Sequence, residues 1–418
     1  MARRITNNHN ADGVDRRGFL ECMAWAGTGV LWTINGGIAS GQLADAATGS
    51  ATGLQFLQIS DSHIGFNKEA NKDVSATLRE AVAKMNAMPA QPAFVLHTGD
   101  ISHLSKPAEF DMASEILKTI KTDRIFFVPG EHDVLDESGK LYLERYGKGS
   151  QGGGWHSFDK NGVHFIGLVN VLNLKAGGLG NLGQEQLDWM KADLQGKSAS
   201  TPVVVFAHVP LWSIYPAWGW GTDDGAQALA YLKPFGSVTI LNGHIHQIVQ
   251  KVEGNITFHT AMSTAFPQPK AGSAPSPGPM KVPEERLRSL LGVTSVNYVQ
   301  GKQSLAVIDS PLQLGAAPDG QDSQKQEGEK PNRQAGKANQ VGISNFAFQP
   351  ATLTVSAGTQ VEWVNHDGEP HKIVSSGKRF SSPALDTDGK YSFRFTEPGS
   401  YPYFCSLHPQ MTGKIVVR

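Results

Sequence analysis

The chain has 418 residues, and its 37 lysines and arginines are balanced by 38 aspartates and glutamates. This balance lacks the basic surplus that is typical of nucleic-acid-binding proteins. The length is sufficient for two or three domains with hydrophobic cores of their own. No stretch after residue 38 is apolar enough to cross a membrane. We therefore expect several folded domains, with neither a nucleic-acid-binding surface nor a membrane span after that residue.

The first 46 residues have the pattern of an export signal. Arg16 and Arg17 are followed by Gly-Phe-Leu, then by a weakly apolar stretch with glycines at 23–38, and then by Ala44-Asp45-Ala46. An arginine pair, an apolar region and a small-residue cleavage site in this order resemble a twin-arginine signal peptide. The resemblance implies export of the folded protein to the periplasm. The alternative is an amphipathic N-terminal helix in which the arginine pair has no such role.

Residues 54–311 predict a layered α/β domain. Short apolar runs that are typical of buried strands occur at 54–59, 94–96, 125–128, 203–206 and 238–241. Longer stretches with helical patterning, such as 74–88 and 108–121, lie between them. This alternation is typical of β-α-β units, in which helices cover the faces of a sheet. Residues 267–283 are rich in Pro, Gly and Ser and predict a surface excursion from the domain.

Polar motifs follow the five predicted strands. They are Asp61-Ser62-His63, Gly99-Asp100, Gly130-Glu131-His132-Asp133, His208, and Gly243-His244-Ile245-His246. Loops at the carboxyl ends of strands build the active sites of α/β sheets, so these side chains are expected to converge. A set of carboxylates and imidazoles without a thiolate suits a pair of Mn, Fe or Zn ions. Two such ions about 3.5–4 Å apart can catalyse an in-line displacement at phosphorus.

The five motifs, in this order and strand context, resemble the calcineurin-like metallophosphoesterase family over nearly all of 54–311. The resemblance implies a four-layer α/β sandwich with a dinuclear metal site. It assigns one metal to Asp61, His63, Asp100 and His246, and the other to Asp100, Glu131, His208 and His244. Asp100 would bridge the two ions. His132 would be the general acid that protonates the leaving oxygen, while a metal-bridging hydroxide attacks phosphorus.

Glu131 departs from the family pattern. The family usually has Asn at this position, in Gly-Asn-His-Asp, whereas this chain has Gly-Glu-His-Asp. A glutamate can still bind a metal through an oxygen, but it brings a negative charge where a neutral amide is expected. That charge could favour a more highly charged ion such as Fe(III). The alternative is that Glu131 turns away and leaves a mononuclear or degenerate site.

Five further residues near these motifs allow two interpretations each. His97 and His103 flank the Gly99-Asp100 turn and are interpreted as structural histidines in preference to supports for the metal ligands. Trp218 and Trp220 follow His208 closely, and they could form either a lid over the metals or a separate packing cluster. Asp133 is expected to cap the following helix, although it could also orient His132.

The C-terminal part of the chain predicts a linker followed by a small β domain. Residues 315–338 contain no aliphatic side chain larger than Ala and are rich in Gln, Gly, Lys and Glu, as in flexible linkers. Residues 341–418 contain short alternating runs at 352–355, 360–364, 391–395 and 413–417, separated by turn sequences. Such runs favour a small antiparallel sandwich.

Cys405, His408 and Met411 are spaced three residues apart, and His371 lies upstream. A thiolate, two imidazoles and a weak axial thioether form the ligand set of a blue-copper site. The other cysteine, Cys22, lies in the predicted signal, so Cys405 would be unpaired in the processed protein. This domain resembles the cupredoxin family, especially plastocyanin and amicyanin, which implies a Greek-key fold with His371, Cys405 and His408 as strong copper ligands and Met411 as the axial ligand. The alternative is a buried cysteine beside a surface turn.

Three functions fit this combination. The first is an exported, dinuclear-metal phosphoesterase that hydrolyses phosphate monoesters or diesters and carries an accessory copper domain. The second is a periplasmic redox protein in which the phosphoesterase fold has lost hydrolysis. The third is a copper-handling protein whose larger domain only binds a phosphorylated ligand. The expected partners are a phosphoester substrate and an electron-transfer or copper-donor partner. An intact His132 favours the first function, because electron transfer does not require an acid that protonates a leaving group.

Overall fold

The computed structural model describes residues 30–35, 38–43, 53–136, 138–299, 305–313 and 339–418. The predicted linker at 315–338 lies outside these residues, as does most of the predicted signal at 1–46. From the signal region the structure describes two antiparallel strands, β1 (Val30–Asn35) and β2 (Ile38–Leu43). The export prediction therefore stays a prediction.

The larger domain is built on two sheets. One has the strand order β13-β12-β3-β4-β5 and the other β10-β11-β9-β8-β7-β6. The strands of the first sheet are β3 (Gly53–Ile59), β4 (Val95–His97), β5 (Ile125–Phe127), β12 (Gly292–Val299) and β13 (Ala306–Pro311). Those of the second are β6 (His156–Lys160), β7 (Val163–Gly167), β8 (Val203–Ala207), β9 (Val238–Asn242), β10 (Gln250–Glu253) and β11 (Ile256–Thr260). The central strands of both sheets pair in parallel.

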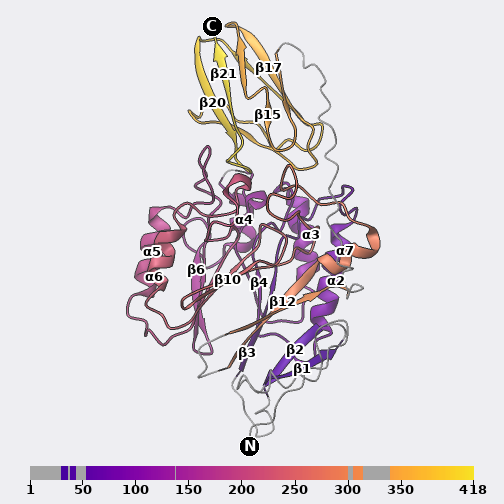
Figure 1. Cartoon of the computed structure of the whole chain (residues 1–418), viewed down its shortest axis with the longest axis vertical. Coiled ribbons are helices and arrows are strands. Elements are labelled where there is room, and N and C mark those ends of the chain that lie inside the picture. Colours follow the sequence, from indigo (N-terminus) through magenta and orange to yellow (C-terminus); the bar gives the residue numbers. More distant parts are fainter. Residues whose placement is uncertain (1–29, 36–37, 44–52, 137, 300–304, 314–338) are drawn as a thin grey trace, which may run out of the picture.

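Helices cover the outer face of each sheet, as Figure 1 shows. They are α2 (Val74–Asn86), α3 (Pro107–Leu117), α4 (Lys140–Tyr146), α5 (Gln184–Leu194), α6 (Gly225–Leu232) and α7 (Glu284–Leu290). Short 3-10 helices cover Glu131–Asp133 and Pro216–Trp218. Helices α2 and α3 pack with β3 on one core, whereas α5 and α6 pack with β8 and β9 on another.

Alternation along the strands explains the layers. In β3, Phe56 lies in a core between the two sheets, whereas Leu57 lies in the core beneath α2 and α3. In β8, Val204 faces the inter-sheet core and Val205 faces α5 and α6. Because successive side chains of a strand point to opposite faces, strands that are apolar on both faces must be covered on both. The order is helix, sheet, sheet, helix, which confirms the predicted four-layer fold class.

The C-terminal domain is a sandwich of two four-stranded sheets, in the orders β15-β14-β17-β19 and β16-β21-β20-β18. Its strands are β14 (Gln340–Ile343), β15 (Phe348–Gln349), β16 (Thr352–Val355), β17 (Thr359–Asn365), β18 (Ile373–Ser375), β19 (Lys390–Phe395), β20 (Gly399–Cys405) and β21 (Thr412–Val417). The all-β sandwich is confirmed, but it is not purely antiparallel. Strands β14 and β17 pair in parallel, as do β16 and β21, because crossovers between the sheets separate them in sequence.

The C-terminal domain sits on the carboxyl ends of the larger domain's strands (Figure 1). Lys372 of the β domain donates a hydrogen bond from Nζ to the Leu135 carbonyl at 2.5 Å, and Lys68 pairs with Asp386 at 3.1 Å. The Leu135 side chain is buried within the core cluster of the β domain. The two domains therefore share an interface that includes apolar packing.

The helices of the larger domain are short, and none in the described part of the chain combines the length and apolarity that crossing a bilayer requires.

Candidate metal centres

The five polar motifs meet where the carboxyl ends of the two sheets come together. Asp61, Asp100 and Glu131 follow β3, β4 and β5 of one sheet, whereas His208 and His244 follow β8 and β9 of the other. The loops are tightly interlocked, because the backbone N–H of Asp61 donates to the Gly99 carbonyl at 3.0 Å and that of Gly243 donates to the His208 carbonyl at 3.0 Å. Residues that are up to 185 positions apart in the sequence thus form one compact site.

Glycine is required at two places in these loops because other backbone or side-chain atoms approach too closely. A Cβ on Gly130 would lie 2.0 Å from Oδ1 of Asp100, and a Cβ on Gly243 would lie 2.0 Å from Oγ of Ser60. Any side chain there would displace the carboxylate-bearing loops. The glycines that precede Glu131 and His244 in the sequence motifs therefore have a packing role.

Five of the seven predicted metal ligands in this domain have backbone φ in the left-handed region. The residues are Asp61, His63, Asp100, His244 and His246, with φ between 39° and 71°. A non-glycine residue in this region costs free energy, and such residues cluster at functional sites, where the surrounding structure holds them. The hydrogen bonds between the loops are what holds them here. For example, the His63 backbone N–H donates to the Asp100 carbonyl at 2.9 Å.

One donor cluster contains Asp61, His63, Asp100 and His246, each buried and each offering a ligand atom within 4.8 Å of the others. Nε2 of His63 lies 3.4 Å from Oδ2 of Asp100, and Nε2 of His246 lies 3.3 Å from Oδ1 of Asp61. The opposite nitrogen of His246, Nδ1, is 2.6 Å from the Phe266 carbonyl. A hydrogen bond from Nδ1 to a carbonyl leaves the Nε2 lone pair free for a metal.

The second cluster contains Glu131, His208 and His244. Oε1 of Glu131 lies 2.9 Å from Nδ1 of His244, and its Oε2 lies 3.0 Å from Nε2 of His208. Glu131 therefore points into the site and does not turn away from it. Oδ2 of Asp100 lies 3.2 Å from the same His208 nitrogen, so this one oxygen faces both clusters.

Unpaired polar atoms show that the second cluster fits a cation. Nδ1 of His208 is 2.7 Å from the Thr98 carbonyl, and its Nε2 lies 3.0 Å from Oε2 of Glu131. Oε2 of Glu131, Nε2 of His208 and Nδ1 of His244 are buried with no hydrogen-bond partner in the described structure. Burial alone would lower the pKa of His208, but the carboxylates of Asp100 and Glu131 raise it well above its ordinary value. Positive charge is strongly favoured at this point, and a metal ion supplies it.

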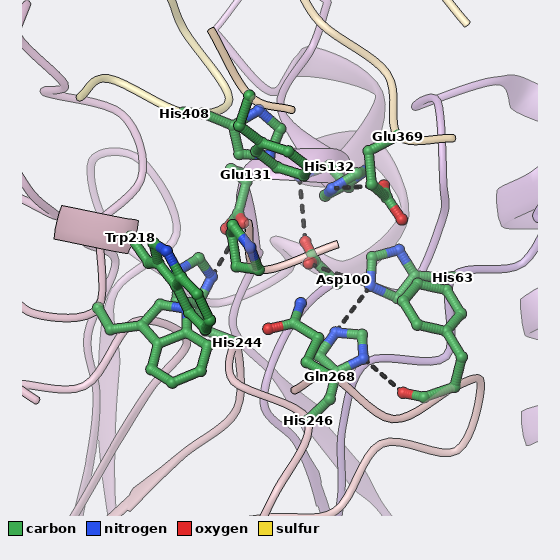
Figure 2. Close-up of a pocket in the computed structure, with 14 residues that line it drawn as sticks. His63, Asp100, Glu131, His132, Trp218, His244, His246, Gln268, Glu369 and His408 are labelled. Atoms are coloured by element: carbon green, nitrogen blue, oxygen red, sulfur yellow. Dashed lines mark hydrogen bonds and ion pairs between the residues drawn. The ribbon is translucent and has the colours of Figure 1, made fainter. Parts of the chain in front are cut away.

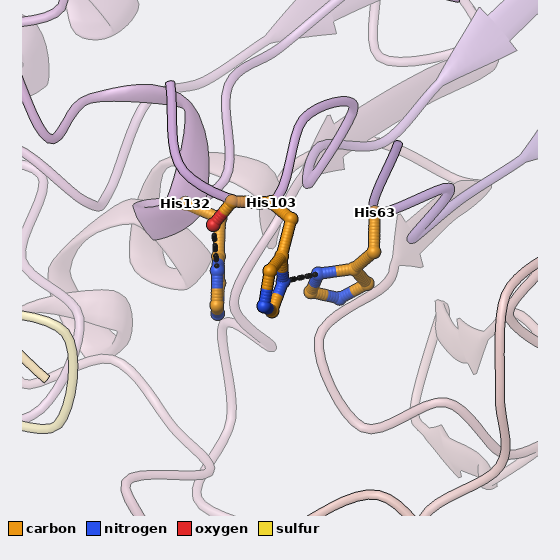
Figure 3. A group of neighbouring side chains, drawn as sticks. All are labelled: His63, His103 and His132. Atoms are coloured by element: carbon orange, nitrogen blue, oxygen red, sulfur yellow. Dashed lines mark hydrogen bonds between the residues drawn. The ribbon is translucent and has the colours of Figure 1, made fainter. Parts of the chain in front are cut away.

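His132 lies beside the two clusters with one nitrogen directed into the pocket. Its Nδ1 is 2.8 Å from the His103 carbonyl, and the ring of His103 in turn lies against His63, with their Nδ1 atoms 3.4 Å apart (Figure 3). Burial disfavours a charged His132, but the carboxylates of Asp100 and Glu369 outweigh burial and raise its pKa to about 9. His132 thus lines the pocket beside both donor clusters, with its Nδ1 fixed by the His103 carbonyl.

Of three neighbouring residues, His103 and Asp133 differ from the interpretation that the sequence favoured, whereas His97 agrees with it. His103 contacts a predicted ligand and orients His132, so it supports the site, whereas Nε2 of His97 is 2.9 Å from Oγ of Ser62. Asp133 does not cap the next helix, α4, which begins after Gly139. Its carboxylate instead accepts hydrogen bonds from the backbone N–H groups of Ile101, Ser102 and Gly130. Asp133 thereby joins the loop that carries Asp100 to the loop that carries Glu131.

Both domains line the pocket above these donors, as Figure 2 shows. Trp218 and Trp220 form part of its wall and also pack with Ile245, as the interpretation of a packing cluster predicts. A role as a lid stays a prediction. The stretch 267–283 is not only a surface excursion, because Gln268 and Pro277 line the pocket as well. Phe346, Glu369 and His408 reach it from the C-terminal domain. Sequence reasoning missed Gln268, which lies in the 267–283 stretch of the larger domain. It also missed Phe346 and Glu369, since only the docking of the two domains brings them to the pocket.

The predicted copper ligands also converge. Sγ of Cys405 lies 3.6 Å from Nδ1 of His371 and 3.6 Å from Nδ1 of His408, and the two nitrogens are 3.3 Å apart. This triangle has the size that one transition-metal ion fills, because bonds from such an ion to nitrogen and sulfur are about 2.0–2.3 Å long. The Met411 side chain is buried in the same core cluster as Cys405, and its axial role stays a prediction.

Hydrogen bonds around the copper ligands orient them. Oδ2 of Asp367 lies 2.9 Å from Nε2 of His371, which directs Nδ1 toward Cys405. The Lys372 backbone N–H donates to Sγ of Cys405 at 3.5 Å. Burial would raise the pKa of the Cys405 thiol, but the hydrogen bond and charge of His371 lower it overall. Cys405 forms no disulfide in the described structure and is favoured as a thiolate, the form that binds metals.

Comparison with known families agrees with both domains. Residues 54–248 match the model of the calcineurin-like phosphoesterase family, and residues 323–417 match that of the cupredoxin-like domain. The chain joins a calcineurin-like phosphoesterase domain to a cupredoxin-like domain.

Individual relatives resemble one domain each. For the cupredoxin, amicyanin-alpha of Methylorubrum extorquens is 37% identical over 84 residues, which are 19% of this chain and 71% of that protein. For the phosphoesterase, a probable glycerophosphodiester phosphodiesterase, GpdQ, of Arcobacter nitrofigilis is 26% identical over 170 residues, which are 37% of this chain and 56% of that protein. Among solved structures, a purple cupredoxin from Nitrosopumilus maritimus is 34% identical, with 19% of this chain and 98% of that one covered and a TM-score of 0.18.

We predict that replacing Asp100 with Asn removes most of the metal bound by the phosphoesterase domain. Asp100 faces both donor clusters, so its loss weakens both at once. Elemental analysis after loading with Mn, Fe or Zn should find about two ions per native chain and fewer than one in the variant. Asp111→Asn, at an exposed position on α3, is the matched control and should keep both ions. Equal metal content in the Asp100 and Asp111 variants would contradict the assignment of a shared ligand.

We predict that the full-length protein becomes intensely coloured with Cu(II), because a copper–thiolate bond in trigonal geometry absorbs strongly in the visible range. Cys405→Ser should abolish the colour, which an absorption spectrum measures directly. His366→Gln serves as the control, because this partly exposed histidine lies outside the donor triangle. A colourless but tightly bound copper complex in the native protein would indicate Cu(I) carriage instead.

Proposed function

We propose that the protein is an exported phosphoesterase with a dinuclear metal site, carrying a copper-binding domain on top of that site. The observation that supports this function best is the position of Asp100. One oxygen of this carboxylate faces two separate donor clusters, and His132 lies directly beside them. A shared carboxylate with a neighbouring acid is the arrangement that metal-assisted hydrolysis of a phosphoester requires.

The chain's own residues would hold the two metal ions and form the walls of the pocket. One ion would be held by Asp61, His63 and His246. The other would be held by Glu131, His208 and His244. Asp100 would bind both ions. When bound, two such ions polarise phosphoryl oxygens and lower the pKa of water at the site. The buried carboxylates would hold the ions in place, and side chains of both domains form the walls around them. The candidate metals are Fe, Mn and Zn. The extra negative charge of Glu131 would favour a trivalent ion such as Fe(III) in the second position.

His132 would complete the reaction by protonating the departing alcohol. Its Nδ1 is engaged by the His103 carbonyl, so in the charged ring the second proton is on Nε2 and would be the one that is transferred. The backbone N–H of His132 also donates to Oδ1 of Asp100 at 3.1 Å. The acid is thereby fixed relative to the carboxylate that both ions would share.

The substrate would be a phosphate ester of a small alcohol. The relative from Arcobacter nitrofigilis is named for activity on glycerophosphodiesters, which supports a phosphodiester for this chain. The cupredoxin domain and the arginine pair at 16–17 support a periplasmic location, reached by twin-arginine export. A folded protein exported in this way could acquire the phosphoesterase metals before export and copper afterwards.

A redox or copper-handling function is the second candidate, and one observation favours it. His408 points Nδ1 at the copper triangle and also lines the pockets that contain Glu131 and His244. Copper bound there would supply one-electron chemistry next to the phosphoesterase site. An assay of hydrolysis distinguishes the phosphoesterase from the redox protein. A purely redox protein loaded with metals would cleave neither aryl phosphates nor aryl phosphodiesters, although a reductant would still bleach its copper colour.

We predict that His132→Ala lowers kcat far more for esters with poor leaving groups than for activated aryl esters. General acid catalysis contributes most where the departing oxygen is basic, so the loss for alkyl esters should be about 10²–10⁴-fold. Steady-state kinetics on an alkyl and a nitrophenyl ester of the same phosphate measures the difference, and metal content should not change. Equal losses on the two esters would show that His132 is structural or a metal ligand.

A further inference from the structure

The cupredoxin domain forms the roof of the phosphoesterase pocket. Besides the contacts of Lys372 and Lys68, the Gly177 backbone N–H donates to the Pro409 carbonyl at 2.6 Å. Gly219, next to Trp218, lies so close to the cupredoxin domain that a Cβ there would be 3.0 Å from Gln410. Contacts thus surround the pocket on several sides, and cupredoxin side chains become part of its lining.

Glu369 is an ionisable residue of the cupredoxin domain that lies beside His132, the proposed general acid. Its Oε2 lies 3.9 Å from Nε2 of His132, and the residue is only 5% exposed (Figure 2). The loop that carries it is rigidly built. The Asn365 side chain donates to the Glu369 carbonyl at 2.8 Å, and the Asp367 carboxylate accepts from the Asn345 and Phe346 backbone N–H groups. The carboxylate is therefore held in the pocket by the fold of the second domain.

The Glu369 carboxylate has no hydrogen-bond partner among the described residues, on either oxygen. Its separation from His132 is too long for a hydrogen bond. On the phosphoesterase side of the same pocket, Oε1 of Gln268 is also buried without a partner. Buried acceptors are normally satisfied, and leaving one unpaired costs about 1–3 kcal/mol or more. Burial raises the pKa of Glu369 to about 7, which shows that its ionised form is costly in this pocket. A ligand that donates hydrogen bonds to these oxygens would offset that cost.

The location of Glu369 excludes two other uses of its carboxylate. It belongs to neither donor cluster of the phosphoesterase site, so it is not placed as a metal ligand. A carboxylate also repels a phosphate group, so it does not bind the phosphate itself. The remaining candidate partner for the Glu369 carboxylate is the part of the substrate that lies next to His132. Because His132 protonates the departing oxygen, that part is the leaving alcohol.

We infer that Glu369 and Gln268 form a subsite for the departing alcohol, which selects phosphoesters whose alcohol carries a hydroxyl or ammonium donor. The inference rests on the proposed hydrolytic function and specifies its substrate class. A polyol or an amino alcohol would satisfy the unpaired oxygens, whereas a plain alkyl or aryl group would leave them unpaired. Discrimination of this kind is strong, since a site built for hydrogen bonds rejects an analogue that lacks them.

The test compares three methyl phosphodiesters that differ only in the departing alcohol: glyceryl, 2-aminoethyl and propyl. The native protein, loaded with metals, should show a higher kcat/KM for glyceryl or 2-aminoethyl than for propyl. Glu369→Ala should lower kcat/KM for the donor-bearing ester by about 10–100-fold more than for the propyl ester, the range expected for losing a hydrogen bond to a charged group. A smaller loss common to all three esters is also expected, because the Glu369 carboxylate helps to raise the pKa of His132. Glu369→Gln keeps an acceptor but removes the charge, so it should impair the 2-aminoethyl ester more than the glyceryl ester.

Two controls separate the subsite from general damage. Glu397→Gln changes an exposed carboxylate of the same domain and should alter none of the rates. The visible absorption of Cu(II) should persist in the Glu369 variants, which shows that the loop carrying His371 is still folded.

Each possible failure has its own signature. Equal losses on all three esters would overturn the subsite, because Glu369 would then act only through His132 or through the fold. Unchanged rates on all three would overturn the subsite and leave the proposed hydrolysis intact. A native protein that cleaves none of the esters, nor a nitrophenyl diester, would overturn the hydrolytic function and the subsite with it.

Discussion

Buried negative charge at the meeting point of two sheets is the constraint on which the rest of the structure depends. Asp61, Asp100 and Glu131 are all buried, and charged groups are costly to bury unless opposite charge surrounds them. Imidazoles from the other sheet supply part of that compensation, and bound metal ions would supply the remainder. The left-handed backbone of the ligand loops and the close approach at Gly130 are consequences of bringing so many donors to one place.

The cupredoxin domain adds a second constraint at the same place. Its loop from Asn365 to His371 carries a copper ligand at one end and, two residues earlier, Glu369 in the phosphoesterase pocket. Both the copper triangle and the shape of the pocket therefore depend on the same short segment. On the opposite side, His408 belongs to the copper triangle and the pocket wall at once. The two domains are thus joined through their functional ends and not merely by a linker.

Much of each domain could be predicted from the sequence, because local patterns carry that information. The apolar runs predicted the central strands, and the polar motifs after them predicted which side chains converge. The spacing of Cys405, His408 and Met411 predicted the copper loop. Glu131 shows the limit of such reasoning, because its sequence context allowed a side chain that points either into the site or away from it. The structure shows that it points in, toward His208 and His244.

The sequence by itself determined the two fold classes, since strand periodicity and motif order are properties of neighbouring residues. Its resemblance to two families predicted which residues belong to each donor cluster. It also indicated a separate small domain at the C-terminus. Only the tertiary structure decided that Glu369, Phe346 and His408 complete the phosphoesterase pocket. It likewise placed Asp133 as a link between two loops. The reason is physical, because contacts between domains depend on the shapes and charges of whole surfaces, which no local pattern along the chain encodes.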